Sequence, residues 1–105
     1  MLEVLIATVT WTDADPAVVT SAQNCSASGG VGGNGTYVVT LSDGIDSAEC
    51  IIRGHVNATA NDENVTWTVA HTSDTVKTIT TQIGDNTGGS VGNVSLSLAF
   101  YRATK

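Results

Sequence analysis

Apolar and polar residues alternate along the closing stretch of the chain, from Gly92 to Arg102. A period of two residues predicts a β-strand that turns one face toward a hydrophobic core. The apolar side chains of this stretch are Val94, Leu96, Leu98 and Phe100. The opposite face is small and mildly polar and consists of Asn93, Ser95, Ser97, Ala99 and Tyr101. Such a face suits either the outer surface of a sandwich or a seam where another subunit comes close, and the pattern leaves both open.

The opening stretch, from Leu2 to Thr12, carries apolar side chains on both of its predicted faces. One face holds Leu2, Val4 and Ile6, and the other holds Leu5, Val9 and Trp11. A strand that is apolar on both sides is typical of a central strand or of one covered by a partner. The residues that follow, Asp13 to Pro16, are turn formers and end the strand.

Turn-forming residues divide the rest of the chain into further short alternating segments. The predicted strands cover residues 36–41, 48–56, 65–70 and 76–83, with a short segment at 17–20 and an ambiguous edge at 21–28. Seven or eight strands at intervals of roughly ten residues favour an all-β antiparallel β-sandwich or jelly roll. The length of 105 residues fits a single domain, residues 1–105. An immunoglobulin-like core disulfide is disfavoured, because Cys25 and Cys50 are close in sequence with no Trp between them.

A glycine-rich stretch contains the pattern G-x-G-x-x-G from Gly30 to Gly35. That pattern binds dinucleotides when a strand precedes it and a helix follows it, because the phosphate then meets the helix N-terminus. Here an alternating β segment, Thr36 to Leu41, follows the glycines. The stretch is therefore predicted to be a loop, as is the second glycine-rich stretch, residues 84–90.

The charge balance narrows the range of partners. The chain has a net charge of −6 with four basic residues, and charged residues make up 13% of it. Without a basic patch, binding to nucleic acid and to anionic membrane surfaces is disfavoured. The N-terminus lacks the basic region of a signal peptide, and we expect synthesis inside a cell without secretion.

Candidate catalytic and metal-binding residues are few and scattered. His55 and His71 are the two imidazoles, and no nucleophile motif surrounds any Ser or either Cys. The wide spacing of Cys and His disfavours zinc. Acidic residues in predicted loops leave calcium open, although none fits a helical calcium-binding loop: Asp13, Asp15, Asp43, Asp46, Asp62 and Glu63. We therefore predict no enzymatic activity and no cofactor, and the alternative of a small hydrolase requires a site centred on a histidine.

Three segments resemble the small virion proteins of tailed bacteriophages. They are Gly35-Thr36-Tyr37-Val38-Val39-Thr40-Leu41, residues 71–78 from His71 to Thr78, and the closing Leu96-Ser97-Leu98-Ala99-Phe100-Tyr101-Arg102. Some of those virion proteins resemble the trimeric jelly roll of the tumour-necrosis-factor and complement-head type. The resemblance implies that the closing strand lies in the inner sheet, near a threefold axis.

The resemblance also implies a function, which is the leading hypothesis from the sequence. The chain would be a capsid decoration, or cement, protein that sits on the phage head as a homotrimer and contacts the major capsid protein in the virion. The predicted contact residues are Leu5, Val9, Trp11, Ser95, Ser97, Ala99 and Tyr101. The alternative is a tail-fibre tip or adhesin domain that binds a host glycan through the loops at residues 29–35 and 84–90.

Overall fold

Eight β-strands form the regular structure of this protein in a computed structural model that describes residues 2–12, 18–28, 36–58, 65–83 and 94–104. The strands are β1 (Leu2–Trp11), β2 (Val19–Gln23), β3 (Cys25–Ser28), β4 (Thr36–Leu41), β5 (Cys50–Ala58), β6 (Val65–His71), β7 (Val76–Ile83) and β8 (Val94–Thr104). The prediction of an all-β chain with seven or eight strands is confirmed.

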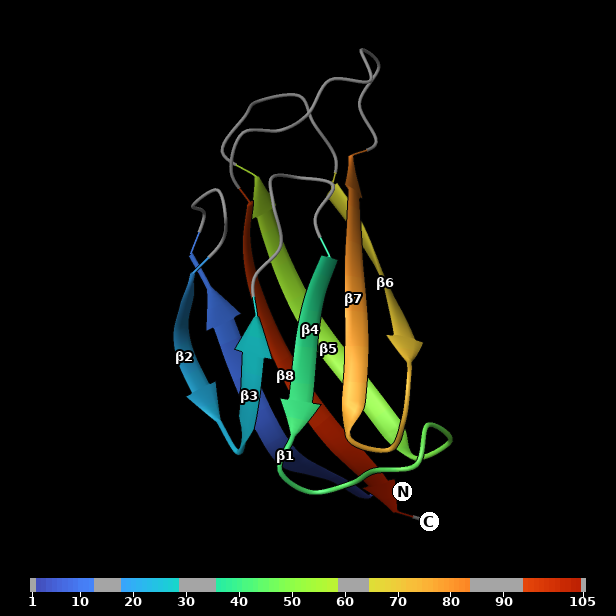
Figure 1. Cartoon of the computed structure of the whole chain (residues 1–105). Coiled ribbons are helices and arrows are strands. Elements are labelled where there is room, and N and C mark those ends of the chain that lie inside the picture. The colour runs from blue at the N-terminus through green and yellow to red at the C-terminus, as the bar shows by residue number, and fades with distance from the viewer. Residues whose placement is uncertain (1, 13–17, 29–35, 59–64, 84–93, 105) are drawn as a thin grey trace.

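The strands form two antiparallel four-stranded sheets that face each other (Figure 1). Sheet A has the order β2-β1-β8-β5, and sheet B has the order β3-β4-β7-β6. The connections β1–β2, β3–β4 and β6–β7 stay within one sheet, whereas the other four cross between the sheets. This arrangement is an antiparallel β-sandwich, in which the last strand, β8, lies beside the first, β1.

The core lies between the sheets and is built from the alternating positions of the strands. From sheet A the closing strand contributes Leu96, Leu98 and Phe100, each at most 2% exposed. This confirms the predicted inner face of that strand for the positions whose side chains the structure describes. The buried core comprises Ala7, Val9, Trp11, Tyr37, Val39, Leu41, Ile45, Ile79, Leu96, Leu98 and Phe100.

Two aromatic rings hold the sheets together at one end of the core. Trp11 of β1 and Tyr37 of β4 meet edge to face, with ring centroids 5.0 Å apart and planes inclined by 65°. This geometry is favourable because the positive edge of one ring meets the negative face of the other. The indole Nε1 of Trp11 donates a hydrogen bond to the carbonyl oxygen of Ser28 at 3.2 Å, so its polar atom is satisfied.

A bulge divides β1 into two parts. Leu5 is paired with Tyr101 of β8, while Ala7 is paired with the adjacent Phe100, so Ile6 is an extra residue in the ladder. An extra residue reverses the alternation of faces beyond it. Leu5 therefore shares a face with Tyr101, whereas Val9 and Trp11 point into the core. The sequence pattern had placed Leu5 on one face with Val9 and Trp11, and the bulge overturns that grouping.

The segment at residues 21–28, which was ambiguous from sequence, contains the corner between β2 and β3. Asn24 stands at this corner with a φ of 57°, a left-handed conformation that Asn tolerates better than most residues. Its side-chain Nδ2 donates to the carbonyl oxygen of Ile6 at 2.8 Å and to Asp43 Oδ2 at 3.1 Å. The strand predicted at 48–56 begins at Cys50, because residues 47–49 form a turn.

Gly54 allows the two sheets to approach each other at β5. A Cβ atom at this position would lie 2.6 Å from Leu98 Cδ2 and 2.7 Å from Trp67 Cζ2, both too close for carbon atoms. Trp67 belongs to β6 in sheet B, and its ring packs against the core over the Gly54 backbone. The Trp67 ring in sheet B therefore fits only because position 54 in sheet A has no side chain.

We expect Gly54→Ala to lower the free energy of unfolding by about 1–3 kcal/mol, because the added methyl group forces Trp67 or Leu98 out of place. Urea denaturation followed by circular dichroism measures this change. The matched control is Gly44→Ala, where the nearest atom to an added Cβ, Asp74 Cβ, is 3.4 Å away. That control should change stability by less than about 0.5 kcal/mol. Equal midpoints for the two variants would contradict the packing argument.

Candidate functional site

The outer face of sheet A, the face turned away from the core, is the candidate contact surface of the protein. Residues of β1, β8 and β5 lie side by side on it in three rows. The rows are Thr10–Ser97–His55, Thr8–Ala99–Arg53 and Leu5–Tyr101–Ile51. Because β8 is the middle strand of each row, its small side chains set the depth of the surface.

Five of the seven predicted contact residues lie on this outer face. Ser97 and Leu5 are exposed, and the other three are half-buried: Ser95, Ala99 and Tyr101. Val9 and Trp11 do not belong to it, because each is 1% exposed and lies in the core between the sheets. The prediction is corrected at these two positions, and the cause is the bulge at Ile6.

A shallow depression of about 370 Å³ lies on the outer face. Its floor is formed around Ser97 and Ala99, whose short side chains leave space, and its walls include Arg53 and His55 of the edge strand β5. Thr8 and Thr10 of β1 line the opposite side. A surface of this shape and low charge presents sheet backbone and small side chains to whatever covers it.

Arg53 organises the charged part of the outer face. Its Nη2 is 2.6 Å from Glu3 Oε1, and its guanidinium carbon is 5.9 Å from the centre of the Tyr101 ring. The ion pair is largely solvent-exposed, so its contribution to stability is small. The Arg53 side chain instead fixes the positions of its neighbours. It holds the Glu3 side chain across the sheet, and its guanidinium covers the Tyr101 ring.

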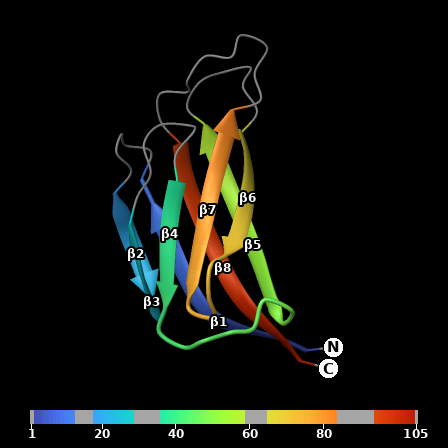
Figure 2. The ribbon, with the colours of Figure 1, turned by 45° about the vertical axis from the view of Figure 1, so that its right-hand side comes forward.

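The ends of β1 and β8 form the far end of sheet A, and Figure 2 shows both termini projecting from the body. We call residues Leu2–Leu5 with Tyr101–Thr104 the terminal ribbon, although β5 still pairs with β8 at Tyr101 and Arg102. β8 has 11 residues and β4 has 6, so at about 3.3 Å per residue sheet A outreaches sheet B. The four exposed large apolar side chains of the described chain include three from this ribbon, Leu2 (63%), Val4 (44%) and Leu5 (53%).

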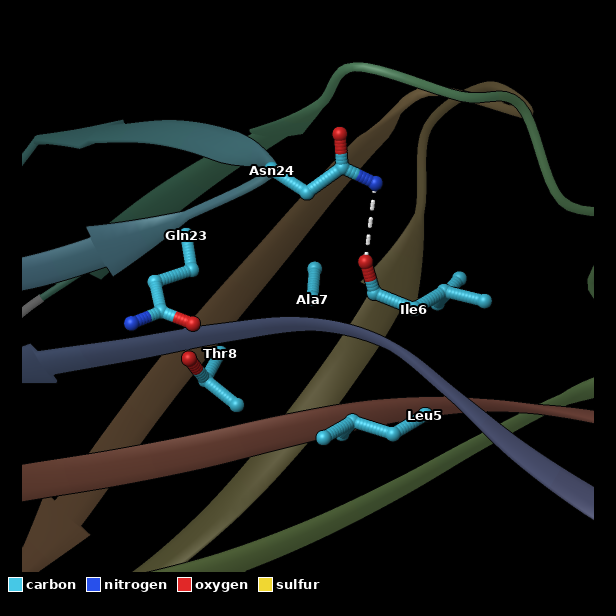
Figure 3. A pocket seen from close by; sticks show the side chains of 6 residues that line it. All are labelled: Leu5, Ile6, Ala7, Thr8, Gln23 and Asn24. Atoms are coloured by element: carbon cyan, nitrogen blue, oxygen red, sulfur yellow. Dashed lines mark hydrogen bonds between the residues drawn. The ribbon is translucent and has the colours of Figure 1, made fainter.

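A pocket of about 160 Å³ opens where the terminal ribbon joins the sandwich (Figure 3). It is lined by Leu5, Ile6, Ala7, Thr8, Gln23 and Asn24. Figure 3 shows the Asn24 side chain reaching over the end of β2 to the Ile6 carbonyl. The pocket exists because β2 ends at Gln23 while β1 continues.

The other candidates for chemistry are separated in the structure. His55 lies on β5 in sheet A and His71 at the end of β6 in sheet B, and both are exposed. Asp43 accepts a hydrogen bond from Asn24, and Asp46 Oδ1 accepts one from the Ala48 amide at 2.9 Å. The described residues contain no group of three or more His, Cys, Asp or Glu side chains that could hold a metal ion.

Other predicted features fall outside the described residues. These are the glycine-rich loops at 29–35 and 84–90 and the acidic residues Asp13, Asp15, Asp62 and Glu63. Within the described ranges, no helix combines the length and apolar character needed to cross a bilayer.

Lys77 is a buried cation that the sequence analysis did not single out. It is 0% exposed, and its Nζ donates to the main-chain oxygens of Ser73 at 2.7 Å and Asp74 at 2.9 Å. These carbonyl groups belong to the connection between β6 and β7, so Lys77 holds that connection in place and two of its three N–H donors find acceptors there. Lys77 is two residues from the buried Ile79 on the same strand, so the alternation of side chains in the sequence indicated that Lys77 points inward.

Both cysteines are free thiols in a partly buried setting. Burial raises the pKa of Cys25, and a backbone hydrogen bond from Gln23 partly opposes this. Burial likewise raises the pKa of Cys50, with the nearby positive charge of Lys77 acting in the opposite direction. Cys25 lies in sheet B and Cys50 in sheet A, and each acts as a small apolar residue against the core.

The sequence matches no family model, no curated protein and no solved structure.

Because burial raises both thiol pKa values, we expect iodoacetamide to react more slowly with the folded protein than with the protein unfolded in urea at the same pH. The single variants Cys25→Ser and Cys50→Ser allow each thiol to be followed separately. A raised thiol pKa means that the folded state holds the proton more tightly. Its contribution to stability is therefore complete below the ordinary thiol pKa and is lost as the pH rises through the folded value. Equal alkylation rates in folded and unfolded protein would refute the assignment.

Proposed function

We propose that this chain is a structural protein that assembles with other proteins through sheet A and its terminal ribbon. Its specific form would be a capsid decoration protein, present as a homotrimer on the head of a tailed bacteriophage. The observation that carries the proposal is the clustering of Leu2, Val4 and Leu5 as exposed apolar side chains on one ribbon. Leu2 and Val4 lie on one face of the ribbon and Leu5 on the other, so both faces expose apolar surface, which in folded proteins marks interaction sites.

The outer face of sheet A supports the same proposal. Ser97 and Ala99 allow a flat approach of another chain, and Arg53 is already paired with Glu3. A surface with little unpaired charge loses little hydration energy when it is covered. β8 lies in the middle of sheet A, and in the proposed trimer sheet A would be the inner sheet that faces the threefold axis.

The proposed partner in the virion is the major capsid protein. Each copy of a decoration protein binds through a modest contact, and several contacts within one trimer raise the overall affinity by effective concentration. The chain has a net charge of −6, which limits unspecific binding to nucleic acid during assembly.

We expect light scattering coupled to size exclusion to give the mass of a trimer for the wild-type chain and of a monomer for Ser97→Arg. The substitution places a long cation in the centre of the outer face, where Ser97 is exposed between Thr10 and His55. The matched control is Ser26→Arg, at an exposed position of β3 in sheet B. Both variants should keep the wild-type circular dichroism spectrum, so that a change in mass reports lost association and not unfolding.

A wild-type monomer, or a trimer that persists in Ser97→Arg, would overturn the trimer seam. Electron cryomicroscopy of particles tests the wider role. A decoration protein occurs in many ordered copies over the shell, whereas a fibre tip or adhesin occurs in few copies at the tail.

A further inference from the structure

His55 is an exposed imidazole in the wall of the depression on the outer face of sheet A. It is paired with Ser97 of β8, at the centre of that face, and Thr10 of β1 completes the row. Histidine is the side chain whose ordinary change of charge falls between pH 5 and 8. We propose that His55 is a pH-sensitive switch of the trimer seam: its neutral form permits copies of the chain to associate through the outer face, and its protonation separates them.

This inference rests on the proposed homotrimer and concerns the regulation of the same surface. In a closed cyclic trimer every copy presents the same residues to the axis. An outer face that turns toward the axis therefore brings His55 and Arg53 of all three copies to one seam. A charge that one copy gains on this face is gained three times within the assembly, and that multiplication is particular to association between identical chains.

The residues around the depression would not neutralise a protonated His55. Among those that line it, Arg53 and His55 are the two that carry or can gain a charge, and both charges are positive. Arg53 precedes His55 by two residues on β5, so the alternation of side chains places both on the outer face. The Glu3 carboxylate is already paired with Arg53 at 2.6 Å. Protonation of His55 would thus add an unpaired cation near another cation.

The strands packed against β5 do not supply a carboxylate either. Neither β8 nor β6 contains Asp or Glu. On the outer face β8 carries the phenol of Tyr101, two rows away from His55, and β6 of sheet B ends at His71. The ion pair between Arg53 and Glu3 is the one found among the described residues, so no described acid is paired with His55.

Covering the outer face makes an added charge costly. A cation that leaves water without a partner loses its hydration, and a like charge nearby raises the cost further. Each copy would therefore release this proton before its face is covered. Association is then complete above the ordinary histidine range and is lost as the pH falls through it. Each imidazole that must release a proton lowers the association constant about tenfold from pH 7.5 to 5.5, and three lower it about a thousandfold.

The charge of the whole chain acts in the opposite direction. The net charge is −6 near neutral pH, and acidification makes it less negative. A smaller net charge reduces the repulsion between copies and would by itself strengthen their association at low pH. Weaker association at pH 5.5 would therefore report a local positive charge and not the general charge balance.

Sedimentation equilibrium over a concentration series, at pH 7.5 and at pH 5.5, measures the association constant. We expect the wild-type constant to fall about a thousandfold between the two pH values. The constant of His55→Gln, which cannot gain the proton, should change by less than about threefold over the same range. The matched control is His71→Gln, which removes the exposed histidine of sheet B and should keep the wild-type pH dependence.

A permanent charge at the same position gives a second test. His55→Lys should associate at pH 7.5 no more tightly than the wild type does at pH 5.5. Circular dichroism should give the same folded spectrum for the wild type at both pH values. Unfolding at pH 5.5 would contradict the inference, because the switch acts on the seam and not on the fold.

The inference is overturned if the wild-type constant is the same at both pH values, or if His55→Gln keeps the wild-type pH dependence. A His55→Gln chain that does not associate at pH 7.5 also overturns it, because the imidazole would then act as a contact and not through its charge. The proposed trimer has its own outcome. A wild-type monomer at pH 7.5 removes the trimer and the switch together, whereas a trimer that ignores pH removes the switch alone.

Discussion

The burial of one face of β8 is the constraint on which the rest of the structure depends. Leu96, Leu98 and Phe100 lie at the centre of the core, and both neighbours of β8 in sheet A take their register from it. Since side chains alternate strictly, fixing these three positions inward fixes Ser97 and Ala99 outward. The core and the candidate contact surface are therefore two faces of the same strand, and a register slip would destroy both.

The fold class and this inner face were predictable from sequence because their signals are local. In a strand of eleven residues with strict alternation, the apolar positions of the sequence directly predict which side chains are buried in the structure. The corner at Asn24 and the bulge at Ile6 were not predictable in this way, because each depends on pairing with residues far away in the chain. Asn24 bonds to Ile6 and Asp43, 18 and 19 residues away.

The candidate site shows the same division. The outer positions of β8 followed directly from the alternation, but the assignment of Val9 and Trp11 to the contact surface assumed an uninterrupted β1. The sequence pattern of β1 does not reveal the extra residue, because both faces of the strand are apolar and the alternation fits equally well with or without a bulge. Lys77 was missed for a different reason, since a charged residue inside a core is rare and its acceptors are carbonyl groups of the local connection.

The difference in strand length between the sheets explains why the contact features gather at one end. Sheet B has strands of four to eight residues, so it cannot cover the inner face of the longer β1 and β8 along their whole length. Leu2 and Val4 thus lie on the inner face of β1 but extend past the end of sheet B, so their side chains remain exposed. A longer sheet B would bury them, and a shorter β1 would remove them. Because β2 ends at Gln23 and pairs with β1 only from Thr8 onward, the apolar residues Leu2, Val4 and Leu5 stay exposed at this end of sheet A.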